Sequence, residues 1–293
     1  MDMNHRKGFT LIELLVVVSA IALLFFILIP VISANHQQSH SAVCLGNQRG
    51  LVMAWLMYAA DNDDKLVNGN AHPRVFLNSK TSSDVETPWV GPPLDEDGNY
   101  KSGDVTFEER LRGIREGALA PYTGQATELY HCPADERVTK GTRHGDRPMY
   151  LFYRSYSVSQ ALSTHDGSDG QLAIKTLSTV QNPSRSMVFV EEAYDGGPGG
   201  NVNFNDAYWN FTGPTCYCWW DPLAIFHPGA TTFSFADGHA VLHKWVEERT
   251  IQYHKDRYGP LNTIFRRVRI DSGQVGDSPD MDWTIRNVGA IYE

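Results

Sequence analysis

The chain has 293 residues, of which 42% are hydrophobic, 11% aromatic and 20% charged, and its formal net charge at pH 7 is −9. This is the composition of a globular protein with enough apolar material for a sizeable core. The negative charge argues against a general affinity for nucleic acid or for anionic lipid, so neither is expected as a partner through charge alone.

The apolar residues are concentrated near the N-terminus. Residues 9–34 contain one charged side chain, Glu13. As a helix this segment would be about 39 Å long, which exceeds the roughly 30 Å of a bilayer's hydrocarbon core. Basic residues lie before it at 5–7, and a polar stretch follows at 35–40. The pattern predicts a transmembrane helix over 9–34 with a cytoplasmic N-terminus and an extracytoplasmic remainder.

Two simpler kinds of targeting segment fit this region less well. A secretory signal peptide has a shorter apolar stretch and a small-residue cleavage site after it. An ordinary signal anchor accounts for the length and orientation but leaves Gly8 and Glu13 without a role.

Residues 8–17 read Gly-Phe-Thr-Leu-Ile-Glu-Leu-Leu-Val-Val and follow a short basic leader. They resemble the type III signal of type IV prepilins and type II secretion pseudopilins. The resemblance implies that residues 1–8 are a leader, that prepilin peptidase cleaves between Gly8 and Phe9, and that Phe9 is then N-methylated. It places the protein in a bacterial inner membrane. The implied partners are the peptidase, other pilin-like subunits and the inner-membrane assembly machinery.

Glu13 is a carboxylate within the apolar segment. Ionised groups in hydrocarbon are costly and are candidates for a functional role. Pairing with the Phe9 amine of a neighbouring subunit would neutralise both charges and favour in-register packing of helices in a filament. The alternative is a carboxylate that extends to the membrane interface.

Beyond the membrane segment, apolar residues recur at helical spacing up to residue 59, so the helix is expected to continue to about residue 60. It should end at an acidic cluster that includes Asp61, Asp63 and Asp64. These carboxylates are weak candidates for a structural calcium site. The simpler interpretation is a solvated turn, because the glycine and distal glutamate of an EF-hand loop are missing.

Residues 61–293 are predicted to form an extracytoplasmic head of short strands separated by turn residues. The expected fold class is α+β, a long N-terminal helix packed on an antiparallel sheet, as in pilins. A helix is predicted at 107–115 and a loosely helical stretch after Trp245. The candidate strands are 89–90, 150–158, 186–190, 232–236 and 240–245.

A second motif runs from His227 to Asp237-Gly238. It is similar to the His-x9-Asp-Gly signature of prepilin-type processing-associated proteins. Asp237-Gly238 is a strong signal for a two-residue hairpin turn, which His227 would cap. The alternative is a metal or catalytic site made by His227, Asp237 and His239.

The four cysteines are Cys44, Cys132, Cys216 and Cys218, and the predicted topology places all of them outside the cytoplasm, where disulfides persist. Three connectivities are open. The favoured pair is Cys44–Cys132, which would tie the N-terminal helix to the head.

The sequence therefore predicts a filament subunit rather than an enzyme, without a cofactor unless calcium binds. One alternative is a membrane-tethered module that binds glycan or a protein partner through the aromatic loop at 209–220. Another is a metal-dependent surface enzyme. No Ser-His-Asp order, phosphate-binding loop or dinucleotide motif supports an enzyme.

Overall fold

The computed structural model describes residues 10–101, 105–136, 142–144, 147–149, 154–163, 174–192, 208–209, 211–212, 218–219, 221–256 and 278–288, apart from some side chains, including those of 27–36. The chain forms two compact units, Met1–His40 and Ser41–Glu293. The second unit is the globular head. It begins within the first helix.

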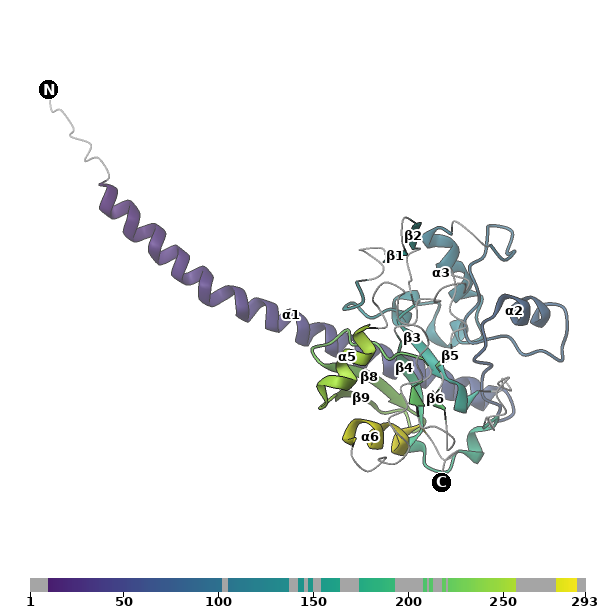
Figure 1. Cartoon of the computed structure of the whole chain (residues 1–293). Coiled ribbons are helices and arrows are strands. Elements are labelled where there is room, and N and C mark those ends of the chain that lie inside the picture. The colour runs from purple at the N-terminus through teal and green to yellow at the C-terminus, as the bar shows by residue number, and fades with distance from the viewer. Residues whose placement is uncertain are drawn as a thin grey trace. The chain divides into compact units, whose positions relative to one another are not determined.

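The first helix, α1, runs over Leu11–Asp61, close to the predicted end near residue 60 (Figure 1). It ends where two aspartates adopt left-handed backbone angles, with φ of 54° at Asp63 and 66° at Asp64. L-residues cannot continue a right-handed helix through such angles. Among the residues that the structure describes, no helix is both long enough and apolar enough to cross a membrane.

The head is built on a five-stranded sheet in the order β5-β3-β4-β8-β9. Four of its strands each run antiparallel to their neighbours among them, and these are β3 (Tyr156–Ser159), β4 (Met187–Glu191), β8 (Ala230–Phe235) and β9 (Ala240–Lys244). The edge strand β5 (Tyr208–Trp209) pairs in parallel with β3. The α+β class with an antiparallel sheet is thereby confirmed. Two small ribbons also form, β1 (Thr142–His144) with β2 (Arg147–Met149), and β6 (Phe211–Thr212) with β7 (Cys218–Trp219).

Every residue of the central strands β4 and β8 is buried, because apolar clusters lie on both sides of the sheet. One cluster contains the head portion of α1, with Leu51 and Trp55 fully buried. The other contains Phe233, Trp245 and Met281. In Figure 1, α5 (Glu248–Asp256) and α6 (Pro279–Asn287) lie beside β8 and β9.

Short helices make up much of the remaining head. These are α2 (Pro73–Ser79), α3 (Phe107–Arg115) and the 3-10 turns η1 (Ala120–Thr123), η2 (Thr127–Tyr130), η3 (Gln160–Leu162), η4 (Leu177–Thr179) and η5 (Pro183–Arg185). Helix α3 has the predicted bounds. A capping box fixes its start, in which the Thr106 side chain accepts from Glu109 N and the Glu109 side chain accepts from Thr106 N.

Two strand predictions need correction. Trp89-Val90 is not a strand. Trp89 is fully buried, donates its N–H to Asn68 O at 2.9 Å and packs against Phe189 with ring centroids 5.1 Å apart. The strand predicted from residue 150 begins at Tyr156, and residues 150–153 lie outside the described part of the chain.

Candidate functional site

The predicted processing segment lies at the start of α1. Gly8 and Phe9 fall outside the described residues, so the proposed scissile bond does too. Glu13 is exposed on the first turn, where its Oε2 accepts from Thr10 N at 2.9 Å and from Thr10 Oγ1 at 2.8 Å. Glu13 N donates in return to Thr10 Oγ1 at 3.3 Å. Glu13 therefore completes a capping box that sets where the helix begins.

The acidic cluster at the end of α1 is tied to the head through Asp64. Asp64 accepts hydrogen bonds from Ser178 N at 3.0 Å and from the Ser178 hydroxyl, which ties the end of α1 to η4. Among the described residues, Asp61, Asp63 and Asp64 are not part of any group whose donor atoms converge as metal ligands. Asp63 and Asp64 end the helix through their left-handed backbone angles, and calcium binding by the cluster stays a prediction.

The hairpin turn between β8 and β9 differs from the two-residue prediction. Phe235 N donates to His239 O at 2.9 Å and Gly238 N donates to Phe235 O at 2.8 Å, which leaves a three-residue loop of Ala236, Asp237 and Gly238. Gly238 has φ of 91°, as the last position of such a loop requires. Asp237 Oδ1 accepts from His239 N at 3.1 Å and contacts His239 Nδ1 at 2.5 Å. These residues build and stiffen the turn.

His227 lies at the opposite end of β8. The six residues of β8 extend about 20 Å, at roughly 3.3 Å per residue, and they separate His227 from the turn. His227, Asp237 and His239 therefore do not form one metal or catalytic site, and His227 does not cap the hairpin turn. His227 instead closes a turn of its own, in which its carbonyl accepts from Ala230 N at 3.2 Å.

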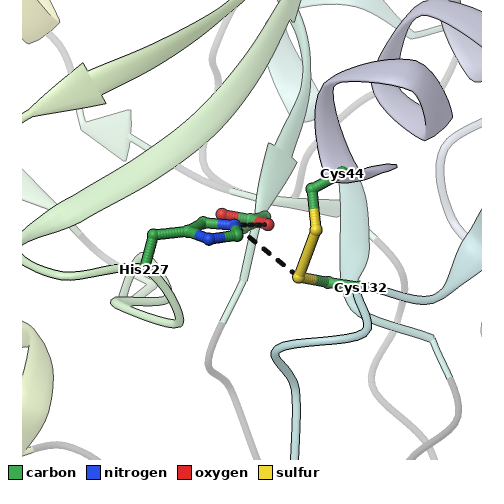
Figure 2. A group of neighbouring side chains, drawn as sticks. Cys44, Cys132 and His227 are labelled. Atoms are coloured by element: carbon green, nitrogen blue, oxygen red, sulfur yellow. Dashed lines mark hydrogen bonds and ion pairs between the residues drawn. A yellow bond between two sulfur atoms is a disulfide. The ribbon is translucent and has the colours of Figure 1, made fainter. Parts of the chain in front are cut away.

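The His227 side chain is buried, with 2% of its surface exposed, and it lies among side chains from three other segments (Figure 2). Its Nδ1 is 3.0 Å from the Ser41 hydroxyl on α1. Its Nε2 is 3.1 Å from Glu191 Oε1 at the end of β4 and 3.7 Å from Cys132 Sγ. Glu191 is fully buried and its Oε2 accepts from Thr232 N at 2.8 Å on β8. A buried carboxylate requires such partners, because desolvation of an unpaired charge is costly.

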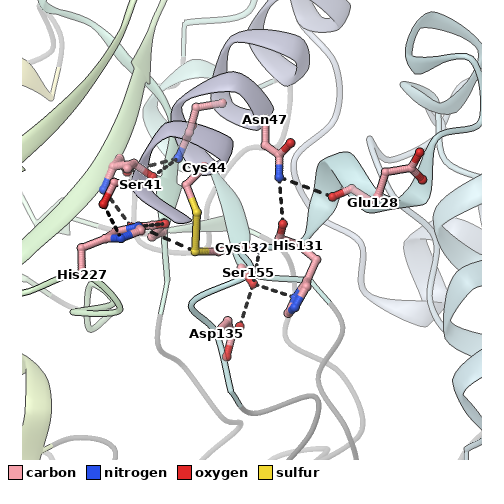
Figure 3. Close-up of a disulfide and its surroundings, with 12 residues drawn as sticks. Ser41, Cys44, Asn47, Glu128, His131, Cys132, Asp135, Ser155 and His227 are labelled. Carbon is pink, nitrogen blue, oxygen red and sulfur yellow. Dashed lines mark hydrogen bonds and ion pairs between the residues drawn. A yellow bond between two sulfur atoms is a disulfide. The ribbon is translucent and has the colours of Figure 1, made fainter. Parts of the chain in front are cut away.

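The structure joins Cys44 on α1 to Cys132, which follows η2, in a disulfide with a Cα–Cα distance of 5.4 Å (Figure 3). This is the pair that the sequence analysis favoured. Asn47, one turn further along α1, donates to His131 O at 2.8 Å, and Cys132 N donates to Ser155 Oγ at 3.0 Å. The bridge thus links the helix to the head alongside direct hydrogen bonds. Cys216 lies outside the described residues, as does the side chain of Cys218.

Cys44, Cys132, Glu191 and His227 form one buried cluster, hereafter the junction cluster, whose donor atoms all lie within 4.8 Å of one another. The sequence pointed to its cysteines and its histidine separately but not to their meeting. Glu191 was missed altogether. Its position directly after the apolar run 187–190 was the only sequence signal for it. An acidic residue at the end of a strand is ordinarily expected to face solvent, so this position did not indicate a buried site.

The aromatic loop considered as a glycan-binding surface is largely part of the core. Trp209 has no exposed surface, Phe211 has 3% and Trp219 has 7%. Tyr217 and Trp220 lie outside the described residues. Three of the five aromatic side chains are therefore buried and do not offer a stacking surface to a sugar.

Residues 3–29 match the family model described as the prokaryotic N-terminal methylation motif, which is typical of type IV prepilin-like proteins. The match supports a type IV pilin-like or pseudopilin protein with prepilin-type processing, and it is consistent with a membrane-anchored N-terminal segment. No curated protein and no solved structure matches the chain.

Proposed function

We propose that the protein is a type IV pilin-like subunit of a secretion or pilus-like filament, cleaved after Gly8 and methylated on Phe9. The observation that carries this proposal is the methylation motif at residues 3–29, which contains Gly8, Phe9 and Glu13 in one short segment. A simple anchor requires none of these three residues. Prepilin peptidase is the first partner in the proposal.

The proposed topology is a single pass through a bacterial inner membrane at residues 9–34, with residues 1–8 in the cytoplasm and the head outside. Two observations support it. Arg6 and Lys7 closely precede the apolar segment, whereas residues 35–40 directly after it include no Arg or Lys. The head contains the Cys44–Cys132 disulfide, a bond that persists in extracytoplasmic compartments and is rare in the cytosol.

The proposed role of Glu13 is to pair with the Phe9 amine of an adjacent pilin-like subunit. Cleavage after Gly8 would create a charged amine four residues before the Glu13 carboxylate. In a low-dielectric membrane each of these charges is costly alone, and their pairing between subunits offsets that cost. The inner-membrane assembly machinery would act on subunits aligned in this way.

The alternatives lose support in the head. The histidines proposed for a surface enzyme lie at opposite ends of β8, and the described aromatic side chains of the proposed glycan loop are buried. We therefore propose that the head has a structural role in the filament and does not catalyse a reaction.

Intact-mass measurement with N-terminal peptide sequencing of the protein from its native membrane tests the proposal. The expected mature chain has 285 residues, which is 293 minus the 8 of the leader, and it begins at N-methylated Phe9. Gly8→Ala should slow or prevent the cleavage. A chain that retains residues 1–8, or one cleaved after the apolar segment, would contradict prepilin processing and leave a tethered or secreted protein.

A further inference from the structure

The junction cluster has the chemical composition of a metal site. It offers two thiols, one imidazole and one carboxylate, and Cys44, Cys132 and Glu191 are fully buried. Thiolate and imidazole ligands favour Zn²⁺ among the common divalent ions. We propose that the dithiol form of the head binds one zinc ion through Cys44, Cys132, His227 and Glu191. The disulfide and the zinc site would then be two alternative ways of linking α1 to the rest of the head.

The spacing of the donor atoms fits this assignment. Zn–S bonds of about 2.3 Å and Zn–N or Zn–O bonds of about 2.1 Å place neighbouring ligands of a tetrahedral site about 3.4–3.8 Å apart. His227 Nε2 lies 3.7 Å from Cys132 Sγ, within this range. It lies 3.1 Å from Glu191 Oε1, slightly below the range, so the imidazole and the carboxylate would move apart slightly to admit the ion. Breaking the disulfide allows the two sulfurs to separate to the distance that a metal requires.

The surroundings of the cluster would orient two of its ligands. The Ser41 hydroxyl lies 3.0 Å from His227 Nδ1, so an Nδ1–H can donate to it while Nε2 presents its lone pair to the metal. Thr232 N donates to Glu191 Oε2 at 2.8 Å and leaves Oε1 directed toward His227. Partners of this kind fix the tautomer and orientation of metal ligands.

The chemistry balances as two steps. A phosphine reductant attacks the disulfide and ends as a phosphine oxide, taking the oxygen of one water molecule, while the two protons of that water end on the cysteine sulfurs. Zn²⁺ then replaces both thiol protons, which leave to solvent. His227 binds as the neutral imidazole and Glu191 as the carboxylate, so the zinc form has one net negative charge.

The zinc form would also retain the connection that the disulfide makes. Cys44 is on α1, Cys132 follows η2, Glu191 ends β4 and His227 precedes β8. A metal bound to all four would join four segments, whereas the disulfide joins two. The inference is independent of the filament proposal, because it concerns the head alone.

The test uses the full-length chain in detergent with Cys216→Ser and Cys218→Ser, which removes the other thiols. The sample is treated with a phosphine and then titrated with Zn²⁺ against a chromophoric chelator. We expect one zinc per reduced chain and none per oxidised chain. Co²⁺ should give the thiolate charge-transfer band and the intense visible bands of a tetrahedral site.

Two matched variants locate the ion. Glu191→Gln replaces a ligand, whereas Glu192→Gln changes the neighbouring buried carboxylate, which accepts from the Ser157 hydroxyl instead. We expect Glu191→Gln to weaken zinc binding at least tenfold and Glu192→Gln to leave it within about twofold, against the 10–100-fold typical of changes around a metal site. Equal affinity in both variants, or no zinc in the reduced parent chain, would overturn the proposal.

A second measurement does not depend on the folding of a variant. Zn²⁺ should slow alkylation of Cys44 and Cys132 in the reduced parent chain, as measured by peptide mass spectrometry. The same experiment with Mg²⁺, a poor thiolate partner, is the control. Equal alkylation rates with both ions would contradict the assignment.

Discussion

At the scale of single residues, the most constrained polar side chains are those of Glu191 and His227. Glu191 has no exposed surface, and its two carboxylate oxygens accept from Thr232 N and contact His227 Nε2. Such a pair contributes little net stability relative to an apolar replacement of both partners, but removal of one partner leaves a buried charge uncompensated. The two residues are therefore expected to tolerate single substitutions poorly.

We expect His227→Ala to lower the free energy of unfolding by about 3–5 kcal/mol, because the Glu191 carboxylate would remain buried without its imidazole partner. Urea unfolding of the oxidised chain measures the loss. His239→Ala is the matched control, since that histidine is on the partly exposed turn, and it should change stability by less than about 1 kcal/mol. Equal losses in both variants would contradict a special role for the buried pair.

His243 gives the head a predicted pH dependence. Burial lowers the pKa of His243 to about 4, and the charge of Asp280 raises it by a smaller amount. The ring stacks on Trp283 with centroids 3.5 Å apart. Because the folded pKa lies below the unfolded value of about 6.5, the unfolded chain binds the proton more readily. Stability is therefore lost as the pH falls from about 6.5 toward 4.

The lowered pKa of His243 should make the head about 1 kcal/mol less stable at low pH, because solvent around the half-buried ring screens much of the effect. His243→Phe keeps a ring against Trp283 and removes the titration. Unfolding measured at pH 7 and pH 4 should show that the variant loses about 1 kcal/mol less than the parent chain. Identical losses would exclude His243 as a source of acid sensitivity.

At the scale of elements, α3 depends on a close approach to the backbone of residues 91–92. Gly91 N donates to Gly113 O at 2.8 Å, and a Cβ atom added at Gly113 would overlap the carbonyl oxygen of Pro92. The glycine is needed here although glycine weakens helices, because no larger residue permits this contact.

Gly113→Ala should therefore destabilise the head by about 3 kcal/mol through overpacking, despite the better helix propensity of alanine. The control is Gly46→Ala in α1, where an added Cβ meets nothing within 4 Å. That variant should gain up to about 1 kcal/mol. Thermal unfolding of the two variants compares them directly, and a stabilised Gly113→Ala would refute the close approach.

The disulfide is the only covalent connection that the described residues show between α1 and a distant segment of the head. It joins cysteines 88 positions apart. Replacing both Cys44 and Cys132 by serine should lower stability by about 2–5 kcal/mol, mainly because the unfolded chain regains the entropy of a long open loop. Chemical denaturation without reductant measures this loss, and an unchanged midpoint would exclude a contribution from the bridge.

The elements that were predicted well have local signals. Helix α3 has the Thr106–Glu109 capping box, and β8 and β9 flank an Asp-Gly turn. The strand prediction at Trp89-Val90 was wrong because it rested on the apolar character of these residues alone. Trp89 N donates to Asn68 O instead, and this tertiary hydrogen bond holds the segment in an irregular conformation. The turn was one residue longer than predicted because the residue before Asp237 joins the loop.

The junction cluster could not be predicted because its members come together only through tertiary packing. The sequence indicated Cys44 with Cys132 and singled out His227, but no spacing relates these residues to Glu191. The opposite error occurred at His239, which is close to His227 in the sequence and far from it along β8. Proximity in sequence is a poor guide to a site when a whole strand lies between its members.

At the scale of the whole molecule, the chain forms two compact units with different chemistry. The first, Met1–His40, contains the methylation motif and the whole apolar segment, and the second contains the described sheet and the disulfide. Substitutions in the first unit therefore test filament assembly, and substitutions in the second unit test the stability of the head.

We expect Glu13→Ala to leave membrane insertion and cleavage intact and to reduce filament assembly at least tenfold, because the proposed charge pair between subunits would be lost. Filaments sheared from cells and quantified by immunoblot measure assembly. Ser19→Ala is the control, since that hydroxyl donates only to Leu15 O of its own helix turn at 2.7 Å among the contacts described. Filaments of normal yield from Glu13→Ala would contradict the pairing.

The position of Cys44, four residues after His40, has a mechanical consequence. Tension applied to the head through the first unit would enter along α1 and reach Cys44 almost at once. From there the disulfide offers a direct path to Cys132 that bypasses the intervening residues. The remainder of α1, including the buried Leu51 and Trp55, would then carry little of the force. We expect tension on the subunit to leave this part of the helix packed in the core until the disulfide is broken.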